Sequence, residues 1–361
     1  TLSLHDALPI YATLMIREVS EKFKLKKDKI EPPEVYLGGR LSEKELNGKR
    51  MLTMTSVDYI KAITKNLEER LSKIGLKLPS RAVTPMSSDY TPEIDATPEL
   101  DQAGITMYQE LIGELRWAIE IGRVDILYKV SVLSAYQASP REGHLDQILH
   151  IFAFLKKNPK LTLYFDPGMP RIDPNIFNGS SAEEFREQYR DAREELPNGM
   201  PRPRGRFVII TAFVDASHAS DKRTRRSHTG FIIFVNRAPI AFYSKRQATV
   251  ESSTFSSEFI ALKTCVEQII GLHFKLRMFG IPIDRPANVL NDNLSAVGNS
   301  SKLESTLNKK HSLVAYHLVR WNVAAEVIKV GWIEMTSNLA DALTKRLPVI
   351  KRDKLFGDWT Y

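Results

Sequence analysis

The sequence has little of several features that define whole classes of protein. Its 361 residues contain one cysteine, Cys265, so an internal disulfide and a cysteine-rich zinc site are both excluded. No apolar run approaches the length of a membrane span. The first ten residues lack a positively charged start followed by a long apolar core, which argues against a secretory signal peptide. These absences favour a reducing compartment over secretion.

The composition is that of a globular protein. Apolar residues make up 43% and charged residues 26% of the chain, and 361 residues give room for two ordinary domains. Lysine and arginine total 51 against 43 acidic residues, which gives a net charge of +8. This basic excess fits a polyanionic partner, although many proteins that bind no nucleic acid share it.

Four short segments of the last third each carry one carboxylate beside the end of a strand or the start of a helix. Asp215 follows the apolar, strand-like run 207–214, and Asp292 ends a second short strand. Glu258 is expected in the first turn of a long helix and Asp341 in the first turn of a late helix, 339–347. Carboxylates gathered at one sheet edge repel one another unless divalent cations neutralise them. Because Mg²⁺ and Mn²⁺ prefer oxygen ligands, the sequence predicts a metal-dependent nuclease site.

Two of these acids have a simpler explanation when each is taken alone. Glu258 could interact with the dipole of its own helix, and Asp292 could be a helix N-cap. The metal-site interpretation therefore depends on all four carboxylates occurring in order.

Two basic groups are candidate contacts for a phosphate backbone. The first is a dense loop after the first strand, and the second precedes a late helix, where a solvated basic face is an equally good interpretation. The residues are Lys222, Arg223, Arg225 and Arg226 in the first group, and Lys309, Lys310 and His311 in the second.

The motifs of the C-terminal part together resemble a known family. In order they are FVDAS (213–217), SHTG (227–230), SKRQ (244–247), SSEFIAL (256–262), NDN (291–293), KKHxxxxYH (309–317) and LADALTK (339–345). Residues 207 to about 347 resemble the ribonuclease H domain of copia-type retrotransposon polyproteins. The stretch 108–165 is similar to the segment after the reverse transcriptase palm in the same polyproteins, so the chain resembles a fragment of such a polyprotein.

The resemblance implies a fold and a set of domains. The expected class is α/β, with a ribonuclease H-like mixed five-stranded sheet flanked by helices and preceded by a mainly helical, thumb- or connection-like region with one short strand near 35–36. Residues 1–12 look like a translated sequencing-adapter junction. We expect the reverse transcriptase remnant at 13–166, a linker at 167–206, the ribonuclease H-like domain at 207–347 and a C-terminal tail at 348–361.

The resemblance also implies a mechanism. Asp215 would bridge two Mg²⁺ or Mn²⁺ ions, Glu258 and Asp292 would hold the ion on the leaving-group side, and Asp341 would hold the ion that activates water. The expected substrate is the RNA strand of an RNA/DNA hybrid, selected through its 2′-hydroxyls. The rest of the polyprotein is the expected partner, with no membrane involved. The expected location is the cytoplasm, within virus-like particles, and the nucleus.

Two departures from the family pattern limit these expectations. No Asp-Asp pair occurs, so the palm aspartates of a polymerase are missing and no polymerase activity is expected. No histidine occurs from Val327 to Asp341, where cellular ribonucleases H carry one. The alternative function is a catalytically inactive nucleic-acid-binding or assembly module from a truncated element. A strand-transfer enzyme of the same fold is a third class, against which the KKHxxxxYH and LADALTK motifs argue.

Overall fold

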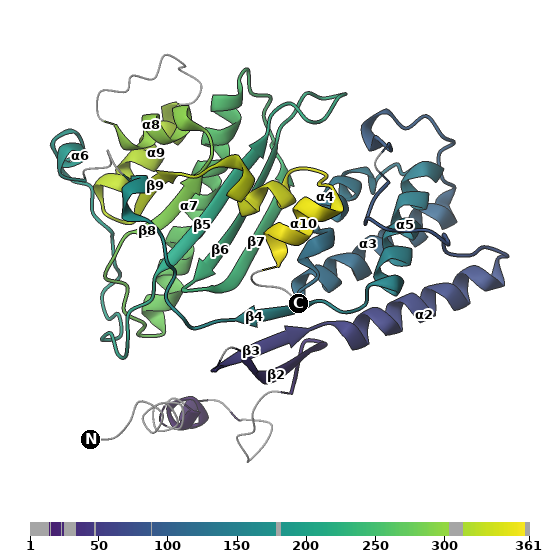
Figure 1. Cartoon of the computed structure of the whole chain (residues 1–361), viewed down its shortest axis with the longest axis horizontal. Helices are drawn as coiled ribbons and strands as arrows, with labels where there is room; N and C mark the ends of the chain where they lie inside the picture. The colour runs from purple at the N-terminus through teal and green to yellow at the C-terminus, as the bar shows by residue number, and fades with distance from the viewer. Residues whose placement is uncertain are drawn as a thin grey trace. The chain divides into compact units, whose positions relative to one another are not determined.

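A mixed sheet of five strands forms the centre of the C-terminal part in the computed structural model of the chain. Its strands are β5 (Ile210–Ser217), β6 (His228–Val235), β7 (Ala238–Arg246), β8 (Ala287–Asn291) and β9 (Ile328–Trp332). They lie in the order β7-β6-β5-β8-β9 (Figure 1). The first three form an antiparallel meander, whereas β8 and β9 run parallel to β5. The predicted mixed five-stranded sheet flanked by helices is therefore confirmed.

The structure describes residues 34–46, 48–87, 89–177, 182–302 and 313–357, together with 14, 16–22 and 24 near the N-terminus. The chain divides into two units, Thr1–Glu34 and Val35–Tyr361, and the account below concerns the second. The adapter-like segment predicted at 1–12 lies outside the described residues. No helix in the described part of the chain is both long and apolar enough to cross a membrane.

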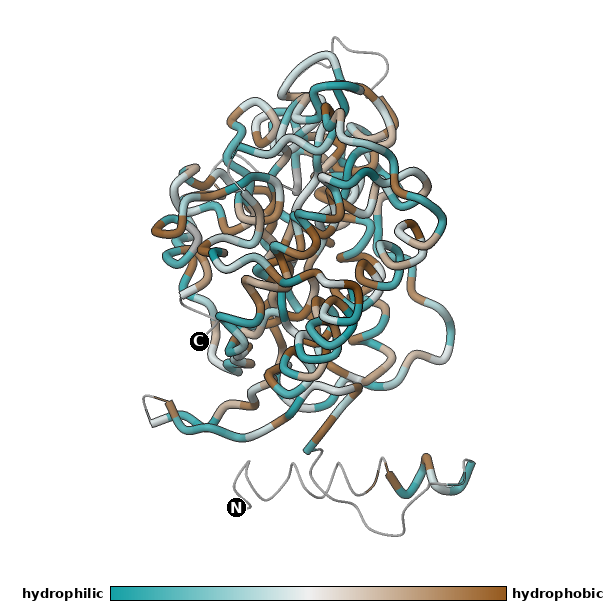
Figure 2. Tube along the Cα trace, turned by 90° about the vertical axis from the view of Figure 1, so that its right-hand side faces the viewer, coloured by the Kyte–Doolittle hydropathy of each residue, from teal (hydrophilic) through white to brown (hydrophobic). Residues whose placement is uncertain are grey.

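Alternating side chains give the sheet two apolar faces. Ala212, Val214 and Ala216 of β5 are buried in the cluster that contains the apolar side of helix α7 (Thr254–Met278). Phe213, between them, packs on the opposite face in a second cluster. Hydrophobic segments accordingly gather towards the interior of the trace (Figure 2). Both faces of the sheet are thus covered, which keeps the β-branched and aromatic side chains of its strands out of water.

Helix α7 begins where its sequence predicts. The Ser253 hydroxyl accepts a hydrogen bond from the Ser256 backbone N–H, so Ser253 is the N-cap. Because the helix starts at Thr254, Glu258 lies just beyond the first turn rather than within it as expected. The next helix, α8 (Leu294–Ser301), is capped by Asn293, whose side chain accepts from the Ala296 N–H. The N-cap explanation for Asp292 is therefore wrong.

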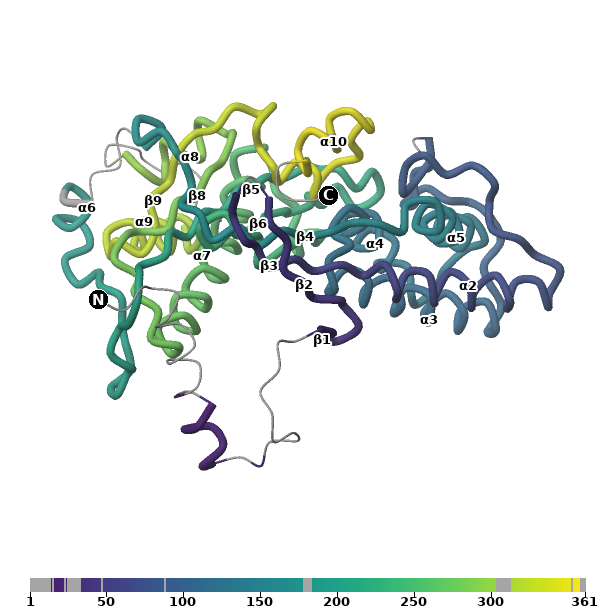
Figure 3. The backbone as a smooth tube through the Cα atoms, turned by 60° about the horizontal axis from the view of Figure 1, so that its bottom comes forward, coloured from purple at the N-terminus to yellow at the C-terminus, as the bar shows by residue number. Residues whose placement is uncertain are grey.

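The N-terminal region is mainly helical, as predicted. Helices α2 (Val57–Lys73), α3 (Gln102–Glu120), α4 (Leu127–Leu133) and α5 (Glu142–Lys157) surround one apolar core (Figure 3). The expectation of a single short strand is wrong, however. Strands β1 (Val35–Tyr36), β2 (Gly39–Leu46), β3 (Lys49–Thr55) and β4 (Thr162–Phe165) form an antiparallel sheet.

The missed strands have a physical explanation. Strand β2 reads GRLSEKEL and is exposed over most of its length, so it shows no apolar alternation. Strand β4 pairs with β3 through residues more than 100 positions away, such as Leu163 opposite Met54. Long-range pairing of this kind leaves no local signal in the sequence.

Three C-terminal segments complete the second unit. Within the expected linker, helix α6 (Ala182–Gln188) buries Phe185 completely in the core of the five-stranded sheet. The late helix expected at 339–347 is instead a 3₁₀ turn, η7 (Leu339–Leu343). The expected tail contains helix α10 (Val349–Phe356), whose Leu355 and Phe356 are buried. The domain limits themselves remain a prediction.

The second apolar cluster joins the N-terminal region to the sheet. It contains Val124 and Leu163 from the N-terminal region, Ile232 and Phe234 from β6, and Leu343 from η7. Helix α4 lies along the edge strand β7, and the Ser131 hydroxyl donates to the Ser244 carbonyl at 2.6 Å. The helical region therefore covers apolar sheet surface that the C-terminal part alone would expose to water.

A buried ion pair supplies a test of this packing. Arg123 donates two hydrogen bonds to Asp125, at 2.9 and 2.7 Å, and the two side chains are 1% and 9% exposed. We expect Asp125→Ala to lower the free energy of unfolding by about 3–5 kcal/mol, because it leaves a buried guanidinium without its counter-charge. Urea denaturation measures this change. The control, Asp58→Ala, removes the exposed Arg40–Asp58 pair and should cost roughly 0.2–1 kcal/mol. Equal losses in the two variants would contradict the prediction.

Candidate metal centre

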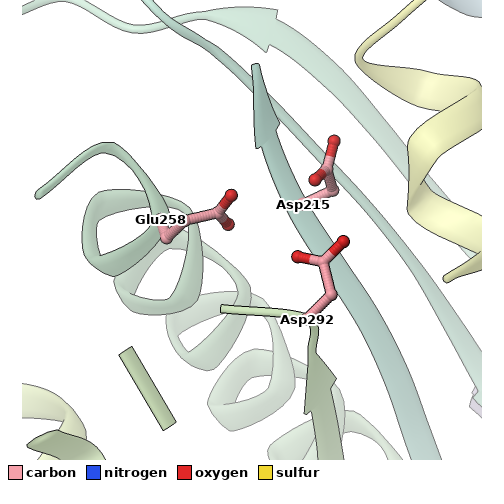
Figure 4. Close-up of side chains that lie close together, drawn as sticks. All are labelled: Asp215, Glu258 and Asp292. Carbon is pink, nitrogen blue, oxygen red and sulfur yellow. The ribbon is translucent and has the colours of Figure 1, made fainter. Parts of the chain in front are cut away.

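Three of the four predicted carboxylates meet at one end of the five-stranded sheet. Asp215 comes from β5, Glu258 from α7, and Asp292 from the residue after β8 (Figure 4). One ligand oxygen from each lies within 4.8 Å of the others. The parallel register of β5 and β8, which sets Val214 opposite Asn291, places Asp215 and Asp292 at the same level. These three oxygens could hold a metal ion.

Two asparagines fix the acids in place. The Asn291 side-chain amide donates to Glu258 Oε2 at 3.0 Å and to the Val214 carbonyl at 3.1 Å. The Asn338 amide donates to the same carbonyl at 2.9 Å. The end of β5 is therefore tied to α7, to β8 and to the segment before Asp341, so that the acids are oriented by buried hydrogen bonds.

Burial raises the cost of the negative charge at this site. Asp215 and Glu258 are 1% and 6% exposed. Burial raises the pKa of Asp215 to about 6, although the Lys345 ammonium opposes the rise. Burial, and then the charge of Asp215, raise the pKa of Glu258 well above its usual value, and burial also raises the pKa of Asp292. A bound divalent cation would offset this penalty.

The fourth acid, Asp341, lies beside this group and is held by two lysines. Its Oδ1 accepts from Lys345 Nζ at 2.6 Å, and its Oδ2 accepts from Lys351 Nζ of helix α10. Lys345 Nζ is also 3.3 Å from Asp215 Oδ1, and the Thr344 hydroxyl donates to Asp215 Oδ2. Asp341 thus joins the other acids through a lysine rather than as a member of the close triad.

Gly230 allows the turn that carries Asp341 to approach the sheet. Gly230 lies opposite Asp215 in the register of β5 and β6. A Cβ atom at this position would lie 2.6 Å from Thr344 Cγ2 and 2.9 Å from Leu343 Cβ. The glycine of the SHTG motif therefore serves the close packing of η7 on the sheet.

Of the two basic groups predicted to contact a phosphate backbone, the structure describes only the first. In the loop between β5 and β6, Lys222, Arg223 and Arg225 are exposed and Arg226 is partly buried. Asp221 anchors this loop by accepting hydrogen bonds from the Thr224 N–H at 2.7 Å and from Arg246 at 2.6 Å. The second group, Lys309, Lys310 and His311, lies outside the described residues.

The sequence reasoning missed several residues at this site. Lys345 stands four positions after Asp341, a spacing that could have indicated an ion pair. Asn291 adjoins Asp292 in the NDN motif but was given no role. Asn338 and Lys351 reach the site only through the fold of their segments. His218, the residue after β5, has its Nδ1 3.3 Å from the hydroxyl of Ser257, the residue before Glu258.

Comparison with known proteins gives relatives but no family model. No family model matches the chain. The chain is 24% identical over 242 residues to a retrovirus-related Pol polyprotein from transposon RE1 of Arabidopsis thaliana. This alignment covers 67% of the chain and 14% of that polyprotein. It is 25% identical over 288 residues to the Pol polyprotein from transposon TNT 1-94 of Nicotiana tabacum, with coverage of 79% and 19%. The chain thus spans less than a fifth of these relatives, and its resemblance to copia-type retrotransposon polyproteins is confirmed.

A solved structure also aligns with the chain. The crystal structure of LC11-RNase H1 in complex with an RNA/DNA hybrid is 14% identical, with a TM-score of 0.31, and covers 37% of this chain and 93% of that one.

The raised pKa of Glu258 predicts a pH-dependent gain in stability from Glu258→Gln. A carboxyl whose pKa is higher in the folded state contributes stability at low pH, and this contribution is lost as pH rises through the folded pKa. In EDTA, Glu258→Gln should therefore have a higher Tm than the unmodified chain at pH 8, and the gain should shrink at pH 5. Calorimetry measures both values, and Glu267→Gln on the exposed side of the same helix is the control. A gain that is independent of pH would refute the explanation.

The lysine contacts predict how Asp341 responds to metal. Lys351→Met should free Asp341 Oδ2 for a cation, because it removes the ammonium from that oxygen. We expect Mn²⁺ to bind about fivefold more tightly, the factor for an ion pair worth about 1 kcal/mol. Titration followed by electron paramagnetic resonance measures the affinity. Lys354→Met, an exposed lysine of the same helix, controls for net charge, and an equal gain in both variants would show that Lys351 does not restrain Asp341.

Proposed function

We propose that this chain is a metal-dependent endonuclease that cleaves the RNA strand of RNA/DNA hybrids during retrotransposon reverse transcription. The observation that carries the proposal is the convergence of Asp215, Glu258 and Asp292 within 4.8 Å at one end of a mixed sheet. These residues come from three elements that are far apart in the chain. The Pol polyprotein relatives support the same context.

The donor set fits hard divalent cations. Its three ligands are carboxylates, with no cysteine or histidine in the triad, which suits Mg²⁺ or Mn²⁺ better than zinc. When bound, such ions lower the pKa of an attacking water and stabilise the charge that develops on the phosphate. Asp215 would bridge the two ion positions, with Glu258 and Asp292 on the leaving-group side and Asp341 on the water side.

The surrounding residues prepare this chemistry. Asn291 holds Glu258 by its Oε2, so the remaining oxygen is left to face Asp215 and Asp292. Lys345 places a positive charge between Asp215 and Asp341, which lowers the repulsion between two buried carboxylates. Its ammonium is partly exposed, and it can therefore turn towards solvent or substrate phosphate when Asp341 takes up a cation. Selectivity for RNA would come from contacts with the 2′-hydroxyl groups.

Cleavage of a labelled hybrid tests the proposal. The full chain should cut the RNA strand in Mg²⁺ or Mn²⁺, leave the DNA strand intact and stop in EDTA. Asp215→Asn should lower the rate at least about a thousandfold, equivalent to roughly 4 kcal/mol of transition-state stabilisation. Asp284→Asn, which changes an exposed aspartate outside the triad, should keep the full rate.

Two other results would reject the nuclease assignment. Cutting by Asp215→Asn at the unmodified rate would show that the triad is not responsible. Tight hybrid binding without any cutting by the unmodified chain would favour the alternative, an inactive nucleic-acid-binding module.

A further inference from the structure

A basic groove lies where the helical region meets the edge of the five-stranded sheet. It has a volume of about 670 Å³, and its walls are α3, α4 and the turn that follows on one side and β7 on the other. Four of the side chains that line it are cationic: Arg116 of α3, Arg226 before β6, and Lys245 and Arg246 at the end of β7. Glu120 is the one acidic side chain among the described residues that line it.

Three of these cations take part in no ion pair with another described residue. Arg246 is paired with Asp221 at 2.6 Å, outside the groove lining. Among the residues that the structure describes, Arg116, Arg226 and Lys245 form no ion pair, and Arg116 and Lys245 are exposed. Cations that two separate segments bring to one concave surface repel one another, so the arrangement is suited to an anion that touches both walls.

The register of the sheet relates this groove to the carboxylates. Asp215 lies opposite Gly230, and Gly230 lies opposite Ser244, which lines the groove. Two strand spacings separate Asp215 from Ser244, a distance of about 10 Å. That is on the order of three nucleotide steps at an axial rise of about 3.4 Å per step. Leu343 and Thr344 cover Gly230 on this face, and the Ser244 hydroxyl donates to the Leu343 carbonyl. A strand engaged at the carboxylates would therefore reach the groove by passing around this turn.

We propose that the groove formed by Arg116, Arg226 and Lys245 binds the sugar-phosphate backbone of the nucleic acid a few nucleotides from the cleavage site. This inference rests on the proposed function and extends it, because it assigns a substrate-binding role to the helical region. Arg116 is the key residue, since it comes from helix α3, which contributes none of the acids. The helical region thus extends the binding surface of the sheet and does more than cover it.

Hybrid binding in EDTA, which prevents cutting, tests the inference with the full chain. The triple variant Arg116→Gln, Arg226→Gln and Lys245→Gln removes three phosphate contacts and should weaken binding at least about tenfold at moderate salt. Each phosphate contact steepens the fall of log affinity with log salt concentration, so the variant should have a shallower slope. Between 50 and 200 mM salt, the factor by which affinity falls should be about 20 to 40 times smaller for the variant than for the unmodified chain. Single-stranded DNA of the same length shows whether the groove takes one strand or requires the duplex.

A matched variant controls for the change in net charge. Arg171→Gln, Arg202→Gln and Lys275→Gln also remove two arginines and one lysine, which are exposed and do not line the groove. This control should keep the salt slope of the unmodified chain. Equal slopes for the groove variant and the unmodified chain, or equal changes in both triple variants, would overturn the inference.

The test separates this inference from the proposed function. Suppose that the unmodified chain cuts hybrid and that the salt dependence of hybrid affinity is the same for the groove variant and the unmodified chain. The groove assignment then fails and the nuclease assignment stands. If the unmodified chain cuts nothing but the groove variant alone loses binding and slope, the groove assignment stands and the nuclease assignment fails. Arg116→Gln by itself should lower the slope by about one, which is the specific evidence for the helical region.

Discussion

The burial of carboxylates at one end of a sheet is the constraint on which the rest of this structure depends. Asp215 and Glu258 are almost fully buried, and burial disfavours their charged forms. The fold reduces the cost with an amide from Asn291, a hydroxyl from Thr344 and an ammonium from Lys345. Asn291 ends β8, whereas Thr344 and Lys345 directly follow the η7 turn, so two distant segments bring compensating groups within hydrogen-bond distance of the acids.

The same segments connect the site to the rest of the second unit. The η7 turn carries Asp341 and also packs Leu343 into the apolar cluster shared by β6 and the N-terminal region. Helix α10 contributes Lys351 to Asp341 and buries Leu355 and Phe356 in that cluster. Apolar packing of η7 and α10 therefore determines where two of the nearby cations lie. This coupling gives the helical region a structural role, in addition to the binding role proposed for its groove.

Much of this could be read from the sequence because the signals are local. The strands β5, β6 and β8 are short apolar runs, and Ser253 marks the start of α7. The resemblance of the ordered motifs then placed Asp215, Glu258 and Asp292 at one end of a sheet, and the structure brings these three together. Of the N-terminal sheet only β1, near 35–36, was predicted, because β2 is mostly exposed and β4 pairs with residues more than 100 positions away.

The sequence by itself determined which residues carry charge and which apolar runs form the strands of the five-stranded sheet, because side-chain chemistry and apolar period are properties of short stretches. Only the tertiary structure decided what each charge faces. It set Asp341 between Lys345 and Lys351, and it placed Arg116 on one wall of a groove opposite Lys245. Contacts of this kind depend on the register of the strands and on how distant segments pack, and no short stretch of sequence contains that information.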